Sequence, residues 1–335
     1  MKKEGGKKKR RWITALAIIL AILLLLFGAA FFTVNHYLNK IQRVDNDSIE
    51  IIEPSNEDFD TDEVPEGLEE IDSDSIEWYE AFDLGDDNLI NILLVGQDRR
   101  EGQGRQRSDT MIVCSINPET YEMSMVSFLR DLYVQFPGDY SDNRLNAAYA
   151  FGGFPLLCET LTLNFGIHID GCIEVDFYSF KDIVDAVGGV DINLTAAEAN
   201  YLGSGVKEGM NHLDGATALD YSRIRMIDSD FYRTGRQRNV LNAIINNVRT
   251  YSVSQIVDLV NALLPYVTTD MSNTQILSLA AKLAPHVSSL QPESYFVPPL
   301  DAYKSAMIRG MAVLVPDRTL IKEYLRNEYL PLGEQ

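Results

Sequence analysis

The most regular apolar runs in the chain predict buried strands. Leu89–Val95 is a continuous apolar stretch that ends at Gly96, which is typical of a strand covered on both faces. Met111–Ile116 and Met123–Phe128 are two further runs, separated by the polar turn Asn117–Thr120. This pattern predicts that the second and third runs form a hairpin.

Helical spacing of apolar residues follows, interrupted by short strands at Cys172–Val175 and Val190–Asn193. One predicted helix, Phe177–Val187, is ended by Gly188 and Gly189. The other predicted helices are Asn146–Phe151, Pro155–Phe165, Asp214–Tyr221, Thr234–Tyr251, Val253–Leu264 and Asn273–Leu283. Because strands and helices interleave, we expect an α/β fold with a mixed central β-sheet sandwiched between helices.

A different hydrophobic pattern lies at the N-terminus. Residues 13–34 form a run of 22 positions without a charge, which at ~1.5 Å per residue covers the ~30 Å hydrocarbon layer of a membrane. Seven Lys and Arg residues lie within the preceding tail, residues 1–12. The positive-inside bias then predicts a single-pass transmembrane helix with a cytoplasmic N-terminus and an extracellular domain. A cleaved signal peptide is the alternative, but its apolar core is usually shorter.

The next segment, residues 35–88, has the composition of a solvated stalk. Between Val44 and Asn88 there are 19 Asp or Glu residues and no Lys or Arg. Such a stretch buries too little apolar surface to offset its ordering entropy. A cation-binding tail is the alternative interpretation. We therefore place the folded domain at residues 89–328.

Charge and cysteine usage exclude several classes of function. The net charge of −20 falls further when the basic tail is removed, so nucleic acid is not expected as a partner. Cys114, Cys158 and Cys172 lack the spacing of a structural metal site. Cys158 and Cys172 could form a disulfide or remain buried free thiols, and their spacing leaves both possibilities open.

Two acidic residues lie at the ends of adjacent predicted strands. Asp98 and Asp109 bound a loop that also carries four arginines. Mg²⁺ commonly takes one or two protein carboxylates and completes its shell with phosphate oxygens and water. The loop is thus a candidate Mg²⁺ (or Mn²⁺) site shared with a phosphate, although simple ion pairs with Arg100 and Arg107 would explain the same residues.

Arginines gather at three further places. The first group follows the hairpin and consists of Arg130 and Asp131, with Arg144 soon after. The second group is Tyr221, Arg223 and Arg225, which would point to one side of the chain if this segment were extended. The third group opens a predicted helix and consists of Asp230, Arg233, Arg236 and Gln237. Cations at the positive end of a helix dipole favour a bound anion, and arginine favours bidentate phosphate contacts. Surface ion pairs with Asp228 and Asp230 are the alternative.

The chain has no nucleophile elbow, phosphate-binding Gly-rich loop or paired metal-ligating histidines. Chemistry must therefore come from Asp, Arg and a metal. Those groups are sufficient for phosphoryl transfer, which mainly requires positioning and charge neutralisation.

The order of the motifs resembles the LytR-CpsA-Psr family. The matching segments run from residue 90 to about 250 and include Ile92–Arg100, Arg107–Thr110, Arg130–Val134, Leu145–Gly153, Tyr221-x-Arg-x-Arg and Asp230-Phe-x-Arg-x-x-Arg-Gln. Departures from the family pattern are Gln97 in place of a small hydroxyl residue, Leu129 in place of proline and Arg144 in place of lysine.

The resemblance implies a role for each cluster. Asp98 and Asp109 match the family's Mg²⁺-binding acids. The residues that match its pyrophosphate-binding set are Arg100, Arg130, Arg144, Arg223, Arg225, Arg233, Arg236 and Gln237. The donor it implies is a teichoic acid or capsular polysaccharide linked to undecaprenyl pyrophosphate, and the acceptor is peptidoglycan.

We expect Arg130 and Arg225 to act on the reacting phosphate, and Asp131 or Asp230 to act as base if one is needed, because arginine stays protonated. The apolar faces of Phe154–Phe165 and Val240–Val248 could line a path for the lipid or simply pack the core. A hydrolase of lipid-linked pyrophosphates and a non-catalytic envelope regulator are the alternative functions.

Overall fold

The computed structural model describes residues 38–46, 49, 68–78, 81–97, 104–224, 227, 230–252, 255, 259 and 262–332. The chain divides into two compact units, residues 1–41 and 42–335. The predicted anchor, residues 13–34, lies outside the described residues, as does most of the predicted helix Val253–Leu264. Among the helices that are described, none has the length and apolar character needed to span a membrane.

The larger unit is built on a mixed sheet of seven described strands in the order β1-β11-β8-β3-β4-β5-β12. Its strands are β1 (Gln42–Arg43), β3 (Ile90–Gln97), β4 (Ser108–Ile116), β5 (Met123–Phe128), β8 (Gly171–Asp176), β11 (Thr268–Thr269) and β12 (Pro292–Val297). The predicted hairpin is confirmed: β4 and β5 are antiparallel, and β4 also pairs antiparallel with β3. Parallel pairing joins β8 to β3 and β12 to β5, so the sheet is mixed as predicted.

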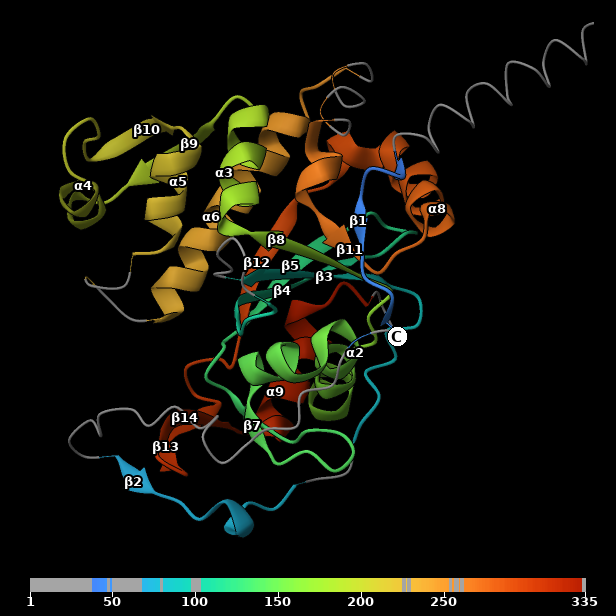
Figure 1. Ribbon diagram of the computed structural model, residues 1–335, viewed down its shortest axis with the longest axis vertical. Coiled ribbons are helices and arrows are strands. Elements are labelled where there is room, and N and C mark those ends of the chain that lie inside the picture. Colours follow the sequence, from blue (N-terminus) through green and yellow to red (C-terminus); the bar gives the residue numbers. More distant parts are fainter. Residues whose placement is uncertain are drawn as a thin grey trace, which may run out of the picture. The chain divides into compact units, whose positions relative to one another are not determined.

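Helices cover both faces of this sheet (Figure 1). On one face lie α3 (Phe177–Ala186), α6 (Asp230–Val248) and α8 (Asn273–Leu283), and on the other lie α2 (Leu145–Phe165) and α9 (Arg318–Tyr324). The described strands and helices thus confirm the predicted α/β sandwich.

Smaller elements extend the two sides of the sandwich. A lobe beside α3 contains β9 (Val190–Leu194), α4 (Ala196–Leu202), β10 (Gly209–Leu213) and α5 (Gly215–Ser222). Two small sheets complete the other side: β2 (Glu69–Glu70) with β13 (Tyr303–Ile308) and β14 (Met311–Pro316), and β6 (Tyr133–Val134) with β7 (Asn143–Arg144).

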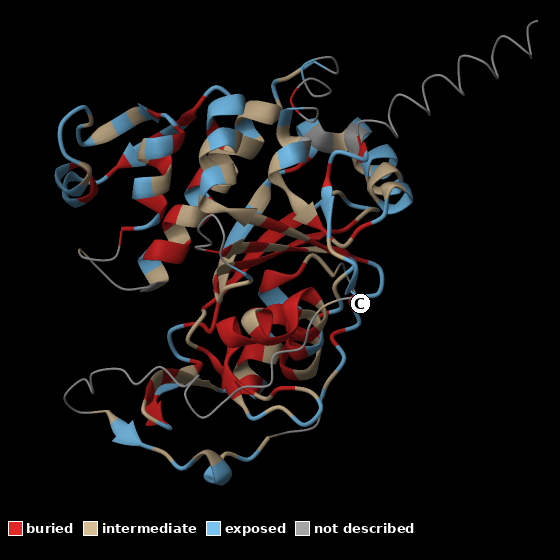
Figure 2. Ribbon diagram, in the orientation of Figure 1, coloured by how far each residue is buried: buried red, intermediate tan, exposed pale blue. Residues whose placement is uncertain are grey.

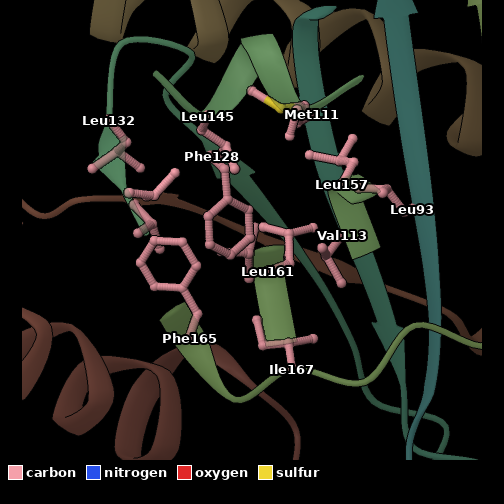
Figure 3. Close-up of a cluster of buried hydrophobic side chains, with 14 of the residues drawn as sticks. Leu93, Met111, Val113, Phe128, Leu132, Leu145, Leu157, Leu161, Phe165 and Ile167 are labelled. Atoms are coloured by element: carbon pink, nitrogen blue, oxygen red, sulfur yellow. The ribbon is translucent and has the colours of Figure 1, made fainter. Parts of the chain in front are cut away.

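The side chains of β4 alternate between the two faces of the sheet, so they contribute to two separate hydrophobic cores. Met111 and Val113 pack toward α2, whereas Ile112 and Cys114 join the cluster that packs against α6 and α8. This follows from the two-residue period of a strand. Figure 2 shows α2 as mainly buried, and Figure 3 shows its Leu157, Leu161 and Phe165 beside Val113 and Phe128. The apolar face of Pro155–Phe165 therefore packs the main core.

The two helices predicted on either side of residue 153 are joined as one bent helix, α2. Gly153 has φ 61° and ψ −148°, a conformation nearly restricted to glycine, and Pro155 follows inside the helix. Arg105 donates to the carbonyl oxygens of Ala150 and Phe151, both at 3.0 Å. These bonds satisfy carbonyl groups that the bend removes from the helical pattern.

Described residues pack against the core before the predicted boundary at residue 89. Leu84 is fully buried and Asp86 is 2% exposed. Within the segment predicted as a stalk, residues 42–43 pair with β11 and residues 69–70 pair with β13. An acidic segment can be held in this way because backbone hydrogen bonds at a sheet edge do not depend on side-chain polarity.

Candidate functional site

A carboxylate and a guanidinium meet where β4 begins and β5 ends. Asp109 is the second residue of β4, and Arg130 lies two residues after β5. Because the two strands are antiparallel neighbours, these positions fall at the same edge of the sheet. Arg130 Nη1 lies 2.8 Å from Asp109 Oδ1, and both side chains remain 20–24% exposed. This partly exposed pair is the centre of the candidate site.

A chain of charges continues from that pair. Asp131 lies between two arginines, with its oxygens 3.5 Å from Arg130 Nε and 3.8 Å from Arg144 Nε. Arg144 is 7% exposed, and its Nη2 donates to the carbonyl oxygen of Ala312 at 2.7 Å. Asp131 is therefore placed to hold the two guanidinium groups at a fixed spacing.

The first turn of α6 brings Arg233 to the same edge. Arg233 is 2% exposed, and its Nη2 donates to the backbone carbonyl oxygen of Asp109 at 3.4 Å. Gln237 is one turn further along α6, on the face of Arg233, and is half-buried. Asp230 is the first residue of α6. The structure thus brings together residues from β4, the β5 end, β7 and α6.

Arg236 has contacts of a different kind. It is 3% exposed, its Nε lies 2.7 Å from Glu198 Oε1, and its Nη1 donates to the carbonyl oxygen of Ile224 at 3.0 Å. Burial tends to raise the pKa of Glu198, but hydrogen bonds from Thr195 and Arg236 outweigh it and lower that pKa. The acidic partner of Arg236 among the described side chains is thus Glu198, a residue not considered from the sequence, and Asp228 lies outside the described residues.

The extended alternation expected for Tyr221, Arg223 and Arg225 is wrong at its first two positions. Helix α5 runs through Ser222, and Arg223 follows with φ −103° and ψ 0°. Tyr221 is 1% exposed, whereas Arg223 is exposed and its guanidinium lies 4.4 Å from the centre of the Phe177 ring. The helical N-cap at Asp214 and the buried Tyr221 favour a helical turn here.

Asp98, Arg100 and Arg225 lie outside the described residues, but the supports of the 98–103 loop are described. Gln97 is fully buried at the end of β3. Its side-chain amide donates to Glu174, and its oxygen accepts from the backbone N–H of Gln106 at 2.9 Å. Tyr149 of α2 also donates to Glu174. The residue that departs from the family pattern, Gln97, thus links both ends of the loop to a buried carboxylate.

Glu174 and Glu198 are the residues that sequence reasoning missed. Glu174 is 3% exposed in the middle of β8, and Glu198 is 7% exposed in α4. A charged residue inside the apolar strand Cys172–Val175 was a signal for the first. The capping box of Thr195 and Glu198 at the start of α4 was a signal for the second.

The geometry is matched by comparison with known proteins. The model of the LytR_cpsA_psr family matches residues 59–327, which is most of the chain. The chain belongs to the LytR_cpsA_psr family. The match starts N-terminal to residue 89, in agreement with the ordered residues found there.

Relatives of this family member include proteins with named activities. A Bacillus mycoides protein named polyisoprenyl-teichoic acid--peptidoglycan teichoic acid transferase TagU is 36% identical over 220 residues, covering 65% of this chain and 71% of the relative. A Bacillus licheniformis protein of the same name is 38% identical over 168 residues, which cover 50% of this chain and 54% of that protein.

Solved structures of the same fold cover most of this chain. A structure described as TagT bound to LIIa-WTA has a TM-score of 0.58 and 25% identity, over 75% of this chain and 96% of that one. The Bacillus subtilis TagV structure has a TM-score of 0.56 and 28% identity, over 73% of this chain and 99% of that one. A structure described as a transcriptional regulator from Enterococcus faecalis has a TM-score of 0.59 and 28% identity, over 76% and 92%.

Proposed function

We propose that this chain is a phosphotransferase that moves an anionic glycopolymer, of the teichoic acid or capsular polysaccharide type, from an undecaprenyl-pyrophosphate carrier to peptidoglycan. The observation that carries the proposal is the Asp109–Arg130 pair at the sheet edge, with Arg233 of α6 against the same strand. The relatives named as teichoic acid transferases support the substrate class.

The described arginines suit a pyrophosphate. Arg130 and Arg144 are held by Asp131 and by the Ala312 carbonyl oxygen, so their positions are set before a ligand arrives. Preorganised cations stabilise charge that develops on a leaving phosphate without reorganising during the reaction. Arg223, Arg233 and Gln237, together with Arg100 and Arg225 outside the described residues, complete the proposed set. In this role Arg130 contacts the reacting phosphoryl group.

Asp109 fits a divalent cation by its chemistry, since hard ions prefer carboxylate oxygens and Mg²⁺ needs only one or two from the protein. We propose Asp98 as the second ligand. When bound, Mg²⁺ or Mn²⁺ would neutralise phosphate charge as a Lewis acid. Asp230, at the start of α6, is proposed to accept the proton of the attacking sugar hydroxyl, because Asp131 already faces two arginines.

The proposed place of action is the outer face of the cell membrane, with residues 13–34 as a single-pass anchor and the N-terminus in the cytoplasm. The composition of the basic tail and the uncharged run supports this placement. An undecaprenyl carrier is membrane-bound, so an anchored domain would meet its donor at the surface.

The experiment that tests the function is transfer of a labelled lipid-linked glycopolymer to peptidoglycan by the full-length chain. We expect D109N to reduce transfer at least ~100-fold, in the range seen on loss of an electrostatic catalytic group, while its melting temperature stays close to the parent value. D87N, at an exposed acid before β3, is the control and should leave transfer unchanged.

Two outcomes would contradict the proposal. Transfer that persists in EDTA would remove the metal from the mechanism. Release of free polymer phosphate at the same rate with and without peptidoglycan would identify a hydrolase instead. Analysis of the products formed with and without peptidoglycan distinguishes transfer from hydrolysis.

A further inference from the structure

A cavity of about 520 Å³ opens beside the first two turns of α6. Its walls come from α6, from Ile227 shortly before α6, from the start of α4, and from the segment of β12 and beyond that carries Phe296 and Leu300. Neither Asp109 nor Arg130 lines it. The cavity is therefore separate from the charged cluster described above.

Two arginines of α6, Arg236 and Arg238, line this cavity, and they differ in their partners. Arg238 is 7% exposed, and its Nε and Nη1 have no hydrogen-bond acceptor among the residues that the structure describes. Its guanidinium carbon lies 5.8 Å from the centre of the Phe296 ring, and burial lowers its pKa to about 10. Arg236, in contrast, is paired with Glu198. A buried cation without a counter-charge is unfavourable, so this guanidinium is ready for an anion.

The mouth of the cavity is apolar. Tyr232 and Leu300 are 65% and 70% exposed and rank among the large hydrophobic residues that the described surface leaves uncovered. Phe231 and Phe296 lie inside, with ring centres 5.3 Å apart. Because Arg236 and Glu198 neutralise each other at the wall, the aromatic and aliphatic surfaces around Arg238 suit a ligand that carries an anionic group on an apolar or saccharide body.

The helix separates this cavity from the proposed pyrophosphate site. Arg233 and Arg238 are five positions apart, which at 3.6 residues per turn places them ~140° apart around α6 and ~7.5 Å apart along it. Among the described residues, Arg238 is the single lining cation outside the Arg236–Glu198 ion pair, which suits one terminal carboxylate. A polymer with a phosphate in every repeat would instead need several cations along a groove.

We propose that this cavity is an acceptor subsite in which Arg238 binds a carboxylate of the peptidoglycan stem peptide, while Tyr232 and Leu300 pack against the acceptor. The inference rests on the proposed function and adds the acceptor contact to it. The acceptor would then enter on a face of α6 different from the one that holds the donor. Such an approach leaves the reacting phosphorus open to in-line attack.

The test measures binding of a soluble disaccharide carrying its stem peptide to the purified full-length chain in detergent, without donor. We expect R238Q to weaken binding about 10-fold or more, as expected for loss of a charge-assisted hydrogen bond, and R238K to retain part of the affinity. The melting temperature of R238Q should be unchanged or higher, because an uncompensated buried charge is removed. R249Q is the matched control, because Arg249 contacts the Ser288 carbonyl oxygen away from the cavity. The R249Q variant should bind the peptide-bearing disaccharide with the affinity of the parent.

A second arm uses the same disaccharide without its peptide, which should bind weakly and with equal affinity to the parent and to R238Q. The inference is overturned if the parent chain does not bind the peptide-bearing disaccharide, or if R238Q binds it as the parent does. A lower melting temperature with unchanged affinity would also overturn it and make Arg238 a structural residue. The binding test contains no donor, so it does not depend on polymer transfer. A failure of transfer in the separate transfer experiment would therefore contradict the proposed function alone.

Discussion

At the scale of single residues, the site is surrounded by buried charges whose partners lie far away in sequence. Arg236 and Glu198 are 38 positions apart, and their side chains are 3% and 10% exposed. The sequence identified the arginines of α6 as a cluster, because their density in an acidic chain is unusual. It could not identify Glu198 as a partner, since that pairing depends on how α4 packs beside α6.

The Arg236–Glu198 pair predicts a loss of stability rather than the neutral effect expected of an exposed phosphate ligand. Replacing Arg236 by Gln leaves a buried carboxylate without its cation, so R236Q should lower the free energy of unfolding by ~3–5 kcal/mol. The double variant E198Q/R236M should recover most of this loss. Chemical denaturation of the parent, R236Q and the double variant measures the three free energies of unfolding. A melting temperature of R236Q equal to the parent's would contradict the structural role of Arg236.

His168 predicts a small dependence of stability on pH. Its hydrogen bond to Asp86, at 3.0 Å, raises the pKa of the imidazole above the ordinary value of 6.5. The folded state therefore binds the proton more tightly than the unfolded state. The stabilisation is complete below pH 6.5 and is lost as the pH rises through the folded pKa.

The size of this effect should be below ~1 kcal/mol, because the imidazole is 55% exposed. Comparing denaturation of the parent and H168Q between pH 5.5 and 8.5 measures it. The free energies of unfolding of the parent and H168Q should differ most at the lowest pH values. A difference that is the same at all pH values would exclude a contribution from the His168–Asp86 ion pair.

At the scale of elements, the central strands β3, β4, β5 and β8 and the helices α3, α6 and α8 were predicted within a few residues of their observed bounds. Continuous apolar runs and glycine stops are local signals, which is why they succeeded. The helices α4 and α9 and the strands β1, β2, β6, β7 and β10–β14 were not predicted, because they are short and partly polar. Of these strands, β1, β11 and β12 join the main sheet, at or next to its edges, where strand patterning is weakest.

The bend in α2 predicts the effect of removing its glycine. A Cβ on Gly153 would lie 3.0 Å from Ile49 Cδ1 and 3.1 Å from Arg105 Nη1, at a φ that L-residues rarely adopt. We therefore expect G153A to lower stability by ~1–3 kcal/mol. G104A is the control, since a Cβ there meets nothing within 4 Å, and thermal melts of both variants should show a loss for G153A only.

At the scale of the whole molecule, the boundary of the folded unit was the least predictable feature. Leu84 is buried and residues 42–43 and 69–70 add short strands to two sheets. An acidic composition indicates solvation on average, but it does not report the few backbone hydrogen bonds that dock a segment. Likewise, the position of Asp98 relative to Asp109 depends on a loop that pattern reasoning does not determine.

Truncation tests this revised boundary. A chain beginning at residue 85 lacks Leu84 and both short strands, so it should melt several degrees below a chain beginning at residue 42. Burial of one leucine contributes ~1.5–3 kcal/mol, and ~1 kcal/mol shifts the midpoint by ~2–4 °C in a domain of this size. Equal midpoints would restore residue 89 as the start of the stable domain.

The sulfur atoms of Cys158 in α2 and Cys172 in β8 lie 3.3 Å apart as free thiols. The hydrogen bond to Cys158 and burial both raise the pKa of Cys172. Disulfide exchange requires a thiolate, so Cys172 is a slow nucleophile even where an oxidant reaches the protein surface. The kinetics of thiol exchange, rather than the distance between the sulfurs, would then decide how long the two cysteines stay reduced in an oxidising environment.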